Sequence, residues 1–324
     1  MKRRSRFLLR GSAYSGAMKK RLPGIVGCIL VWLCAGCAAK KHLTAEEYFK
    51  NATSDFRTGA LPPAIDEFHE LLDEYPFSEY NEEAELKIAH AQYLSGNYPE
   101  AVVALTDFQR RHPTSPNLPF VGYSLGMCYV RQMGTIDRDQ TAAHSAQSYF
   151  TTVSQQYPDS PFAELAREQL SRCREELAEH ELYVAKFYAK EGNTKAAEIR
   201  LLTMAARYGD TSAAADGLLR LATLYWQNNQ ADEATLAYQA LTQLHPRATQ
   251  AEAARRALTG LGVADAPAGD PIDLLLAANG RQRSSGTFET VQVPGLEPPG
   301  ASHRPSAAAA MAPPIDPFGR GRRY

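Results

Sequence analysis

The sequence of 324 residues predicts an all-α protein in which successive pairs of helices stack into a solenoid. The clearest sign is the segment 74–98, where Tyr75-Pro76 ends one helix and Gly96-Asn97 ends the next. Between these stops, small and apolar residues recur at spacings of three and four, the period of an amphipathic helix. The same order of helix, turn, helix and stop returns along the chain. A stack of this kind displays a surface rather than carrying out chemistry.

Residues 1–36 have the composition of an export signal. Lys19 and two further basic residues precede a mostly apolar segment of 13 residues, 22–34, which is too short to cross a membrane as a helix. Met18 stands directly before this basic cluster and is a second candidate for the start of the protein. We therefore expect residues 1–36 to be removed as a signal peptide.

The residues around Cys37 indicate a lipid anchor at the new N-terminus. Small residues precede this cysteine, and the region resembles a bacterial lipoprotein box, in which the cysteine becomes an acylated N-terminus. Cys34 stands where the box usually has leucine, and the alternative is an ordinary secretory signal cut near Ala35. The resemblance implies a lipid on Cys37, and Ala38 in place of aspartate implies the outer membrane. Acyl chains hold a protein on a bilayer without a spanning segment, and residues 37–44 would form the anchored linker.

Loss of residues 1–36 would leave 27 Lys and Arg against 36 Asp and Glu, because that segment holds 8 basic and no acidic residues. The resulting net charge of about −9 argues against a nucleic-acid partner. Cys128 and Cys173 are the cysteines that remain beside Cys37, and both lie on predicted helices among apolar neighbours. Two separate buried thiols are favoured, and a disulfide in an oxidising compartment is the alternative.

Five units fit the tetratricopeptide pattern, which has alanine near position 20 of a 34-residue unit, an aromatic residue or leucine at 24 and proline at 32. Counting back from Pro76 starts the first unit at Ala45 and places Ala64 and Phe68 at the two core positions. The five units close at Pro76, Pro113, Pro158, Gly209 and Pro246. We therefore predict a tetratricopeptide helical solenoid of five helix-pair repeats plus a capping helix across residues 45–262.

Two units depart from the regular spacing. The third has the core Leu125-Gly126 and an inserted polar loop, residues 134–139, between its helices. The fourth has 51 residues (209 − 158) between closing residues instead of 37 (113 − 76), and its extra segment lacks glycine and proline. This predicts one long helix over residues 161–190, about 45 Å at 1.5 Å per residue. Residues 249–260 are expected to close the stack.

The composition changes after Gly262. Residues 263–324 contain 9 Pro and 7 Gly in 62 positions, with a run of four alanines, so this segment has too little apolar surface to offset its ordering entropy. We expect a disordered tail rich in Pro, Ala and Gly, in which residues 271–278 (PIDLLLAA) could fold on a partner.

Motifs of catalysis and of metal or cofactor binding are absent from the sequence. The eight histidines lack the spacing of a metal-ligand pair, and the chain has no glycine-rich phosphate loop, G-x-S-x-G turn or H-E-x-x-H helix. The sequence therefore predicts a protein that is not an enzyme and has no cofactor. Most tyrosines occupy positions where a repeat packs its core. Phe77 and Tyr80 differ because they lie in a link between pairs, where a ligand-facing role and a structural staple both fit.

The links between pairs carry a more specific signal than the repeat. Three of them have proline-centred motifs, which are Tyr75-Pro76-Phe77 followed by Tyr80, residues 112–117 (HPTSPN) followed by Tyr123, and residues 157–160 (YPDS). These motifs, their spacing and the long fourth-unit helix resemble the BamD family, lipoproteins of the outer-membrane β-barrel assembly machine. The resemblance covers residues 45 to 260, and the lipoprotein box agrees with it. Departures are the shorter insertion in the third unit, Gly209 in place of proline, and the tail.

The resemblance implies a scaffold on the periplasmic face of the outer membrane that helps to assemble and insert β-barrel proteins. The implied partners are the barrel-forming assembly subunit with its periplasmic repeat domains, accessory assembly lipoproteins, and unfolded β-barrel substrates. The alternative is another tetratricopeptide lipoprotein, such as a pilotin for a secretin or a coordinator of the cell wall or division.

Candidate binding residues can be chosen for the substrate that the resemblance implies. A β-strand with alternating aromatic side chains is extended, so apolar pockets at the N-terminal units can hold it. The candidates are Phe77, Tyr80, Lys87 and Tyr93, with Lys87 placed to receive a terminal carboxylate. For the barrel-forming subunit the candidate is Arg200, on the second helix of the fourth unit, because a charge there is expected to be either solvated or paired across an interface.

Overall fold

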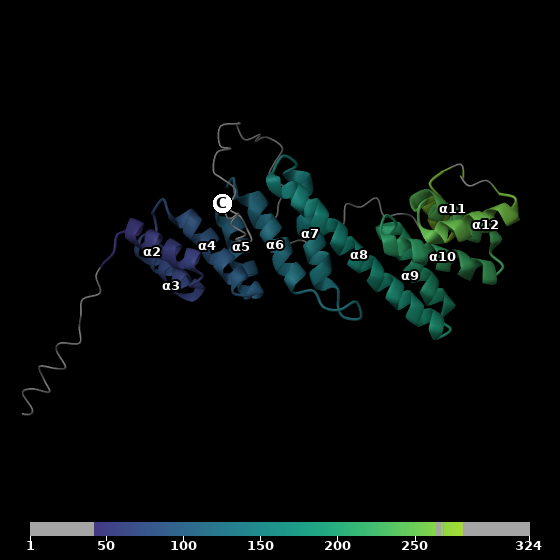
Figure 1. Cartoon of the computed structure of the whole chain (residues 1–324), viewed down its shortest axis with the longest axis horizontal. Helices are drawn as coiled ribbons and strands as arrows, with labels where there is room; N and C mark the ends of the chain where they lie inside the picture. Colours follow the sequence, from purple (N-terminus) through teal and green to yellow (C-terminus); the bar gives the residue numbers. More distant parts are fainter. Residues whose placement is uncertain (1–41, 264–266, 268, 281–324) are drawn as a thin grey trace, which may run out of the picture. The chain divides into compact units, whose positions relative to one another are not determined.

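The computed structural model describes residues 42–263, 267 and 269–280, so the signal peptide, Met18, Cys37 and the chain beyond residue 280 lie outside the described residues. Within the described ranges all regular structure is α-helical, and Figure 1 shows the helices following one another in chain order. The helices are α2 (Ala45–Thr58), α3 (Leu61–Glu74), α4 (Asn81–Leu94), α5 (Tyr98–Arg111), α6 (Leu118–Arg131), α7 (Thr141–Gln156), α8 (Pro161–Lys190), α9 (Thr194–Tyr208), α10 (Ser212–Gln227), α11 (Ala231–Leu244), α12 (Thr249–Leu261) and α13 (Pro271–Ala278).

Consecutive helices pack in pairs, α2 with α3, α4 with α5, α6 with α7, α8 with α9, and α10 with α11. Each pair also contacts the next, and α12 packs on α11. These are the five helix pairs and the closing helix that the repeat pattern predicts, so the fold class is confirmed.

Small residues let the paired helices approach closely. Ala64, Ala101 and Ala146, which occupy position 20 of their repeats, are fully buried. On α6, a Cβ atom added to Gly126 would lie only 2.5 Å from the Phe150 ring on α7. The Leu-Gly step of the repeat therefore leaves room for the ring of its partner helix.

The long helix α8 joins two hydrophobic clusters. Its first half contributes Phe162 and Cys173 to a cluster shared with α4 to α7. Its second half contributes Leu177 and Leu182 to a cluster shared with α9 to α13. The helix has the bounds that the sequence predicts, and its N-terminus is capped by Ser160 Oγ, which accepts a hydrogen bond from Phe162 N at 3.2 Å.

Side chains of α8 also fix the neighbouring elements. His180 Nδ1 lies 2.6 Å from the carbonyl oxygen of Ile136, in the inserted loop of the third pair. Glu175 accepts hydrogen bonds from Ser212 N at 2.9 Å and from Ala213 N at 2.8 Å. A carboxylate of α8 therefore caps the N-terminus of α10.

The expectation of disorder from residue 263 onward is wrong for one segment. Residues 271–278 form α13, in which Ile272, Leu275 and Leu276 are buried. Averaging composition over the whole C-terminal segment hides this short apolar stripe. The predicted disorder beyond residue 280 concerns residues outside the described ranges.

Cys128 and Cys173 are both free and buried, which confirms the expectation of two separate thiols. Burial raises the pKa of each thiol to about 12.

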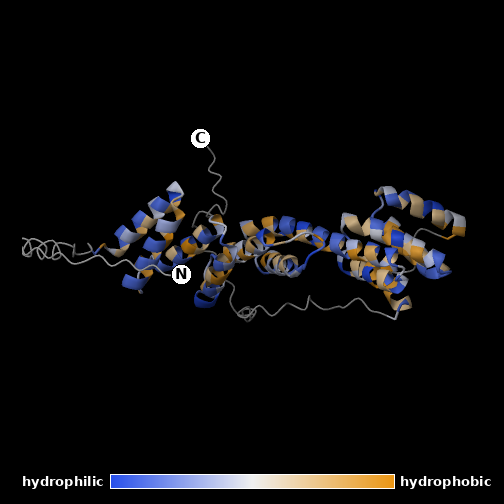
Figure 2. Ribbon diagram, turned by 90° about the horizontal axis from the view of Figure 1, so that it is seen from below, coloured by the Kyte–Doolittle hydropathy of each residue, from blue (hydrophilic) through white to orange (hydrophobic). Residues whose placement is uncertain are grey.

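Hydrophilic and hydrophobic residues alternate along the helices in Figure 2, as in amphipathic helices that pack on one another. Among the described residues, no helix combines the length and the apolar character needed to cross a membrane.

Candidate functional site

A row of aromatic side chains crosses the first helices of the N-terminal pairs. Phe49 and Phe56 are seven residues apart on α2, so they lie on one face two turns apart. The ring of Phe49 stacks on that of Tyr80, with 4.9 Å between centroids and 21° between planes. The Phe56 ring lies 5.3 Å from the imidazole of His90, which lies 6.1 Å from the ring of Phe120 on α6. We call these five residues the aromatic row.

Lys87 places a positive charge within the aromatic row. Its Nζ atom lies 6.0 Å from the ring centroid of Phe49 and 5.6 Å from that of Phe56, within the range of cation–π attraction. The same atom lies 3.2 Å from Glu83 Oε1, and the Lys87 side chain is only 16% exposed. The ammonium group therefore faces two rings and one carboxylate.

Carboxylates surround the N-terminal end of the aromatic row. Desolvation, followed by the negative charges of Glu46 and Glu79, raises the pKa of Tyr80. A tyrosine hydroxyl is neutral near pH 7 in any case, and this shift acts in the same direction. Lys87 provides the positive charge in this acidic surrounding.

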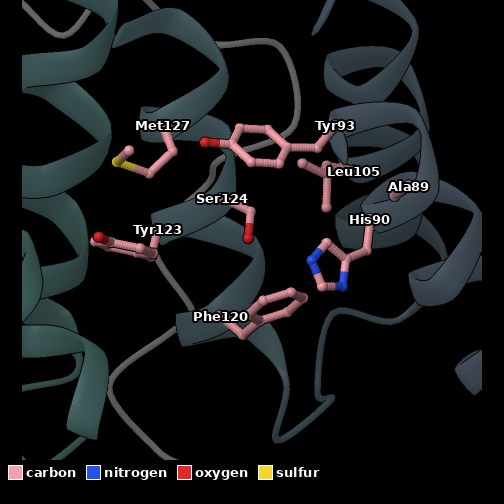
Figure 3. Close-up of a pocket in the computed structure, with 8 residues that line it drawn as sticks. All are labelled: Ala89, His90, Tyr93, Leu105, Phe120, Tyr123, Ser124 and Met127. Carbon is pink, nitrogen blue, oxygen red and sulfur yellow. The ribbon is translucent and has the colours of Figure 1, made fainter. Parts of the chain in front are cut away.

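The aromatic row continues into a small hollow, shown in Figure 3, where the His90 ring lies beside Phe120 and the Tyr93 hydroxyl turns toward Met127. The hollow is lined by Ala89, His90, Tyr93, Leu105, Phe120, Tyr123, Ser124 and Met127. Its cavity volume is about 10 Å³, close to the minimum for one water molecule. The hollow is thus an apolar recess beside the row and does not enclose a ligand-sized space.

The second link motif holds α4, the central helix of the aromatic row, in place. Buried Glu85 on α4 forms an ion pair with Arg111, and its Oε2 atom lies 2.8 Å from His112 Nε2. Ser115 Oγ donates a hydrogen bond to Glu82 Oε1 at 2.6 Å. The residues that carry the family resemblance in this link therefore have a structural task, which is to attach the α5–α6 link to α4.

The structure brings three of the four predicted substrate-binding residues into one region. Tyr80 and Lys87 meet through the ring of Phe49, and Tyr93 lines the adjoining hollow. Tyr93 is only 9% exposed. Phe77, in contrast, is 100% exposed, so its ring lies outside the packing of the aromatic row.

Arg200 lies on α9, but its charge has a partner within the chain. Its Nη1 atom lies 3.2 Å from Glu181 Oε2 on α8, and the side chain is 41% exposed. We expected the charge of Arg200 to be either solvated or paired with another protein. The structure instead pairs it with a carboxylate of the same chain. A carboxylate from another protein can bind Arg200 only in competition with Glu181.

Sequence reasoning does not single out Phe49, Phe56, His90 or Phe120. Part of the signal is present, because Phe49 and Phe56 share one face of the first helix at a spacing of seven residues. Which side chains of α4 meet that face depends on how the two helix pairs pack, and a single sequence does not contain that information in its local pattern.

The stacked helix pairs define a helical-repeat protein, in which each repeat contacts its neighbours and the stack displays an extended surface. Comparison with known families then identifies the family of the chain. A family model described as YfiO, outer membrane lipoprotein, matches residues 41–239, and the chain belongs to this family.

Curated relatives agree with the family match and confirm the resemblance to BamD. A protein of Caulobacter vibrioides named outer membrane protein assembly factor BamD is 30% identical over 169 residues, which cover 51% of this chain and 55% of the relative. Proteins of the same name from Xylella fastidiosa strain 9a5c and Pasteurella multocida are 30% and 28% identical, over 49% and 53% of this chain and 60% and 70% of their own length. The chain thus spans little more than half the length of the first two relatives.

Proposed function

We propose that this chain is a lipid-anchored assembly factor on the periplasmic face of the outer membrane, where it helps β-barrel proteins to be assembled and inserted. The family match over residues 41–239 carries the proposal, because it covers the helix pairs that bear the aromatic row and because its relatives share the name of an assembly factor. Cys37 would carry the lipid. The protein would act as a scaffold without catalysis, cofactor or metal.

The chemistry of the aromatic row fits one class of substrate, an extended peptide with alternating aromatic side chains. Alternate residues of a strand point to the same side and are about 7 Å apart. Neighbouring rings of the row are 4.9 to 6.1 Å apart, a comparable spacing. Rings of an incoming strand would therefore pack on the partly exposed members of the row, Phe49, Phe56 and Tyr80, rather than between rings that already touch. Each aromatic contact contributes about 0.5–1.5 kcal/mol beyond the burial of area.

Lys87 supplies the charge that a terminal carboxylate would meet. Its present partner, Glu83, has a side chain that is 51% exposed, so this carboxylate can turn into water when another replaces it. The exchange keeps the ammonium group paired. A strand that ends in an aromatic residue with a free carboxylate would then satisfy the rings and the charge together.

This binding site can be tested with a labelled peptide that carries alternating aromatic residues and ends in phenylalanine. We expect fluorescence anisotropy to show binding to the full chain, about tenfold weaker binding to Phe56→Ala, and weaker binding of the same peptide when its C-terminus is amidated. Phe77→Ala tests the remaining candidate ring of the link, and Phe187→Ala, which removes a 54% exposed ring on α8, is the matched control that is expected to bind normally. Equal affinity of all these combinations would contradict the site.

The C-terminal helix pairs would bind the barrel-forming assembly subunit, with Arg200 as the candidate contact. Recovery of the Cys37-anchored protein from membranes is expected to bring with it a β-barrel protein that carries periplasmic repeat domains, together with accessory assembly lipoproteins. Absence of such a barrel protein would refute the proposed function.

Charge reversal tests Arg200 itself. Arg200→Glu is expected to reduce the co-purified barrel protein, whereas Arg172→Glu, which reverses an exposed arginine of α8 paired with Glu168, is expected to leave it unchanged. The swap of Arg200→Glu with Glu181→Arg restores the ion pair within the chain. If the swap also restores co-purification, Arg200 acts through the fold and does not contact the partner.

A further inference from the structure

Helix α13 covers an apolar surface of α9 and α11, the second helices of the last two pairs. Ile272, Leu275 and Leu276 lie at i, i+3 and i+4 and are 1%, 0% and 3% exposed, whereas Asp273 and Ala277 are exposed. One face of α13 thus belongs to the same hydrophobic cluster as α9 and α11. We call the area that α13 covers the α9–α11 surface.

Polar contacts at both ends complete the docked helix. Asp270 Oδ1 accepts hydrogen bonds from Ile272 N at 2.8 Å and Asp273 N at 3.2 Å, which caps the N-terminus of α13. At the other end, Asn279 Nδ2 donates to Tyr225 Oη at 2.8 Å, and Tyr225 Oη donates to Glu198 Oε1 at 3.3 Å. The surface therefore recognises an apolar stripe and, beside it, one amide side chain.

The docked state is what makes α13 a helix. It has 8 residues, and isolated helices shorter than about 12–15 residues are marginal in water. Its connection to α12 runs through residues 262–270, and it lies beyond the segment 41–239 that the family model matches. Without α13, α10 still packs against both α9 and α11.

We propose that the α9–α11 surface is a docking site for a short amphipathic helix and that α13 is its resident occupant. A partner helix that takes its place would carry aliphatic residues at i, i+3 and i+4, followed by Asn or Gln placed to reach Tyr225. A short tether gives α13 an effective concentration in the millimolar range, so the partner gains access only by binding more tightly than α13 does at that concentration. No residue of the aromatic row belongs to the hydrophobic cluster that contains α13.

A synthetic peptide of residues 269–280 tests the proposal against the full chain. Ile272→Asp with Leu276→Asp in the full chain places charge on the apolar stripe and is expected to undock α13. The labelled peptide is then expected to bind this variant. It is expected to bind the unaltered chain at least about tenfold more weakly, because the chain's own α13 competes for the surface. A peptide with the same two aspartates is the control and is expected to bind neither. Equal binding to both chains, or to neither, would overturn the proposal, and so would unfolding of the variant, because α13 would then be part of the required core.

Hydrogen exchange of the unaltered chain gives a second measurement that needs no variant. The amides of α13 are expected to exchange about tenfold or more faster than those of α11, because α13 opens alone. Equal exchange of α13 and α11 would mean that α13 opens only together with the last pair, and the proposal would be wrong.

Discussion

The substitution Gly126→Ala measures how tightly the third helix pair is packed. A Cβ atom at this position would lie 2.5, 2.7 and 2.9 Å from three carbons of the Phe150 ring, which is fully buried. Alanine is favoured over glycine inside a helix by about 1 kcal/mol, whereas overpacking a core costs about 1–3 kcal/mol. The ring cannot move away in a closely packed interior. We therefore expect the free energy of unfolding to fall by about 1 kcal/mol.

The matched control is Gly260→Ala on α12, where nothing outside the local helix lies within 4 Å of the added Cβ atom. Gly260 lies in the last turn of α12, where helix propensity has less effect than in the helix interior, so this variant is expected to gain up to about 0.5 kcal/mol. Urea unfolding followed by circular dichroism at 222 nm measures both. In a Phe150→Leu background, which lacks the ring atoms that clash, Gly126→Ala is expected to cost less than it does in the unaltered protein. If Gly126→Ala is as stable as Gly260→Ala, the packing argument for the helix pair is wrong.

Three further predictions concern the polar and sulfur groups of the fold. Tyr225→Phe removes the hydroxyl that donates to buried Glu198 and is expected to cost about 1–3 kcal/mol in urea unfolding, whereas an unchanged midpoint would show that this hydrogen bond contributes nothing. Glu175→Gln removes the charge that caps α10 and is expected to cost about 0.5–1 kcal/mol, with salt reducing the effect; a salt-independent loss would point to packing instead. Cys128 and Cys173 have pKa values raised by burial, so at pH 8 the folded protein is expected to be alkylated about a hundredfold more slowly than the protein in urea, as peptide mapping can measure.

The helices are the part of this protein that local sequence determines. The bounds of α8 follow from Ser160-Pro161 at one end and from the absence of glycine and proline up to Gly192. The closing helix follows from the same kind of signal. These features depend on residues a few positions apart, which is why they can be predicted from one sequence.

The contacts of the candidate sites depend on packing between distant segments. Tyr80 and Lys87 are predicted as binding residues, yet their common neighbour Phe49 comes from another helix pair. The ion pair of Arg200 with Glu181 joins two helices and is invisible to a pattern along one of them. The short helix α13 is missed for a different reason, since its stripe stabilises a helix only where α9 and α11 provide a surface for it.

Site-specific crosslinking in living cells tests most directly whether the aromatic row receives unfolded β-barrel proteins. A photo-reactive amino acid would replace Tyr80 in the row and, as control, Trp226 on α10, which is 52% exposed. We expect adducts with newly made outer-membrane β-barrel proteins from position 80 and few or none from position 226. Adducts of equal yield from both positions, or none from position 80, would contradict the proposed role of the row.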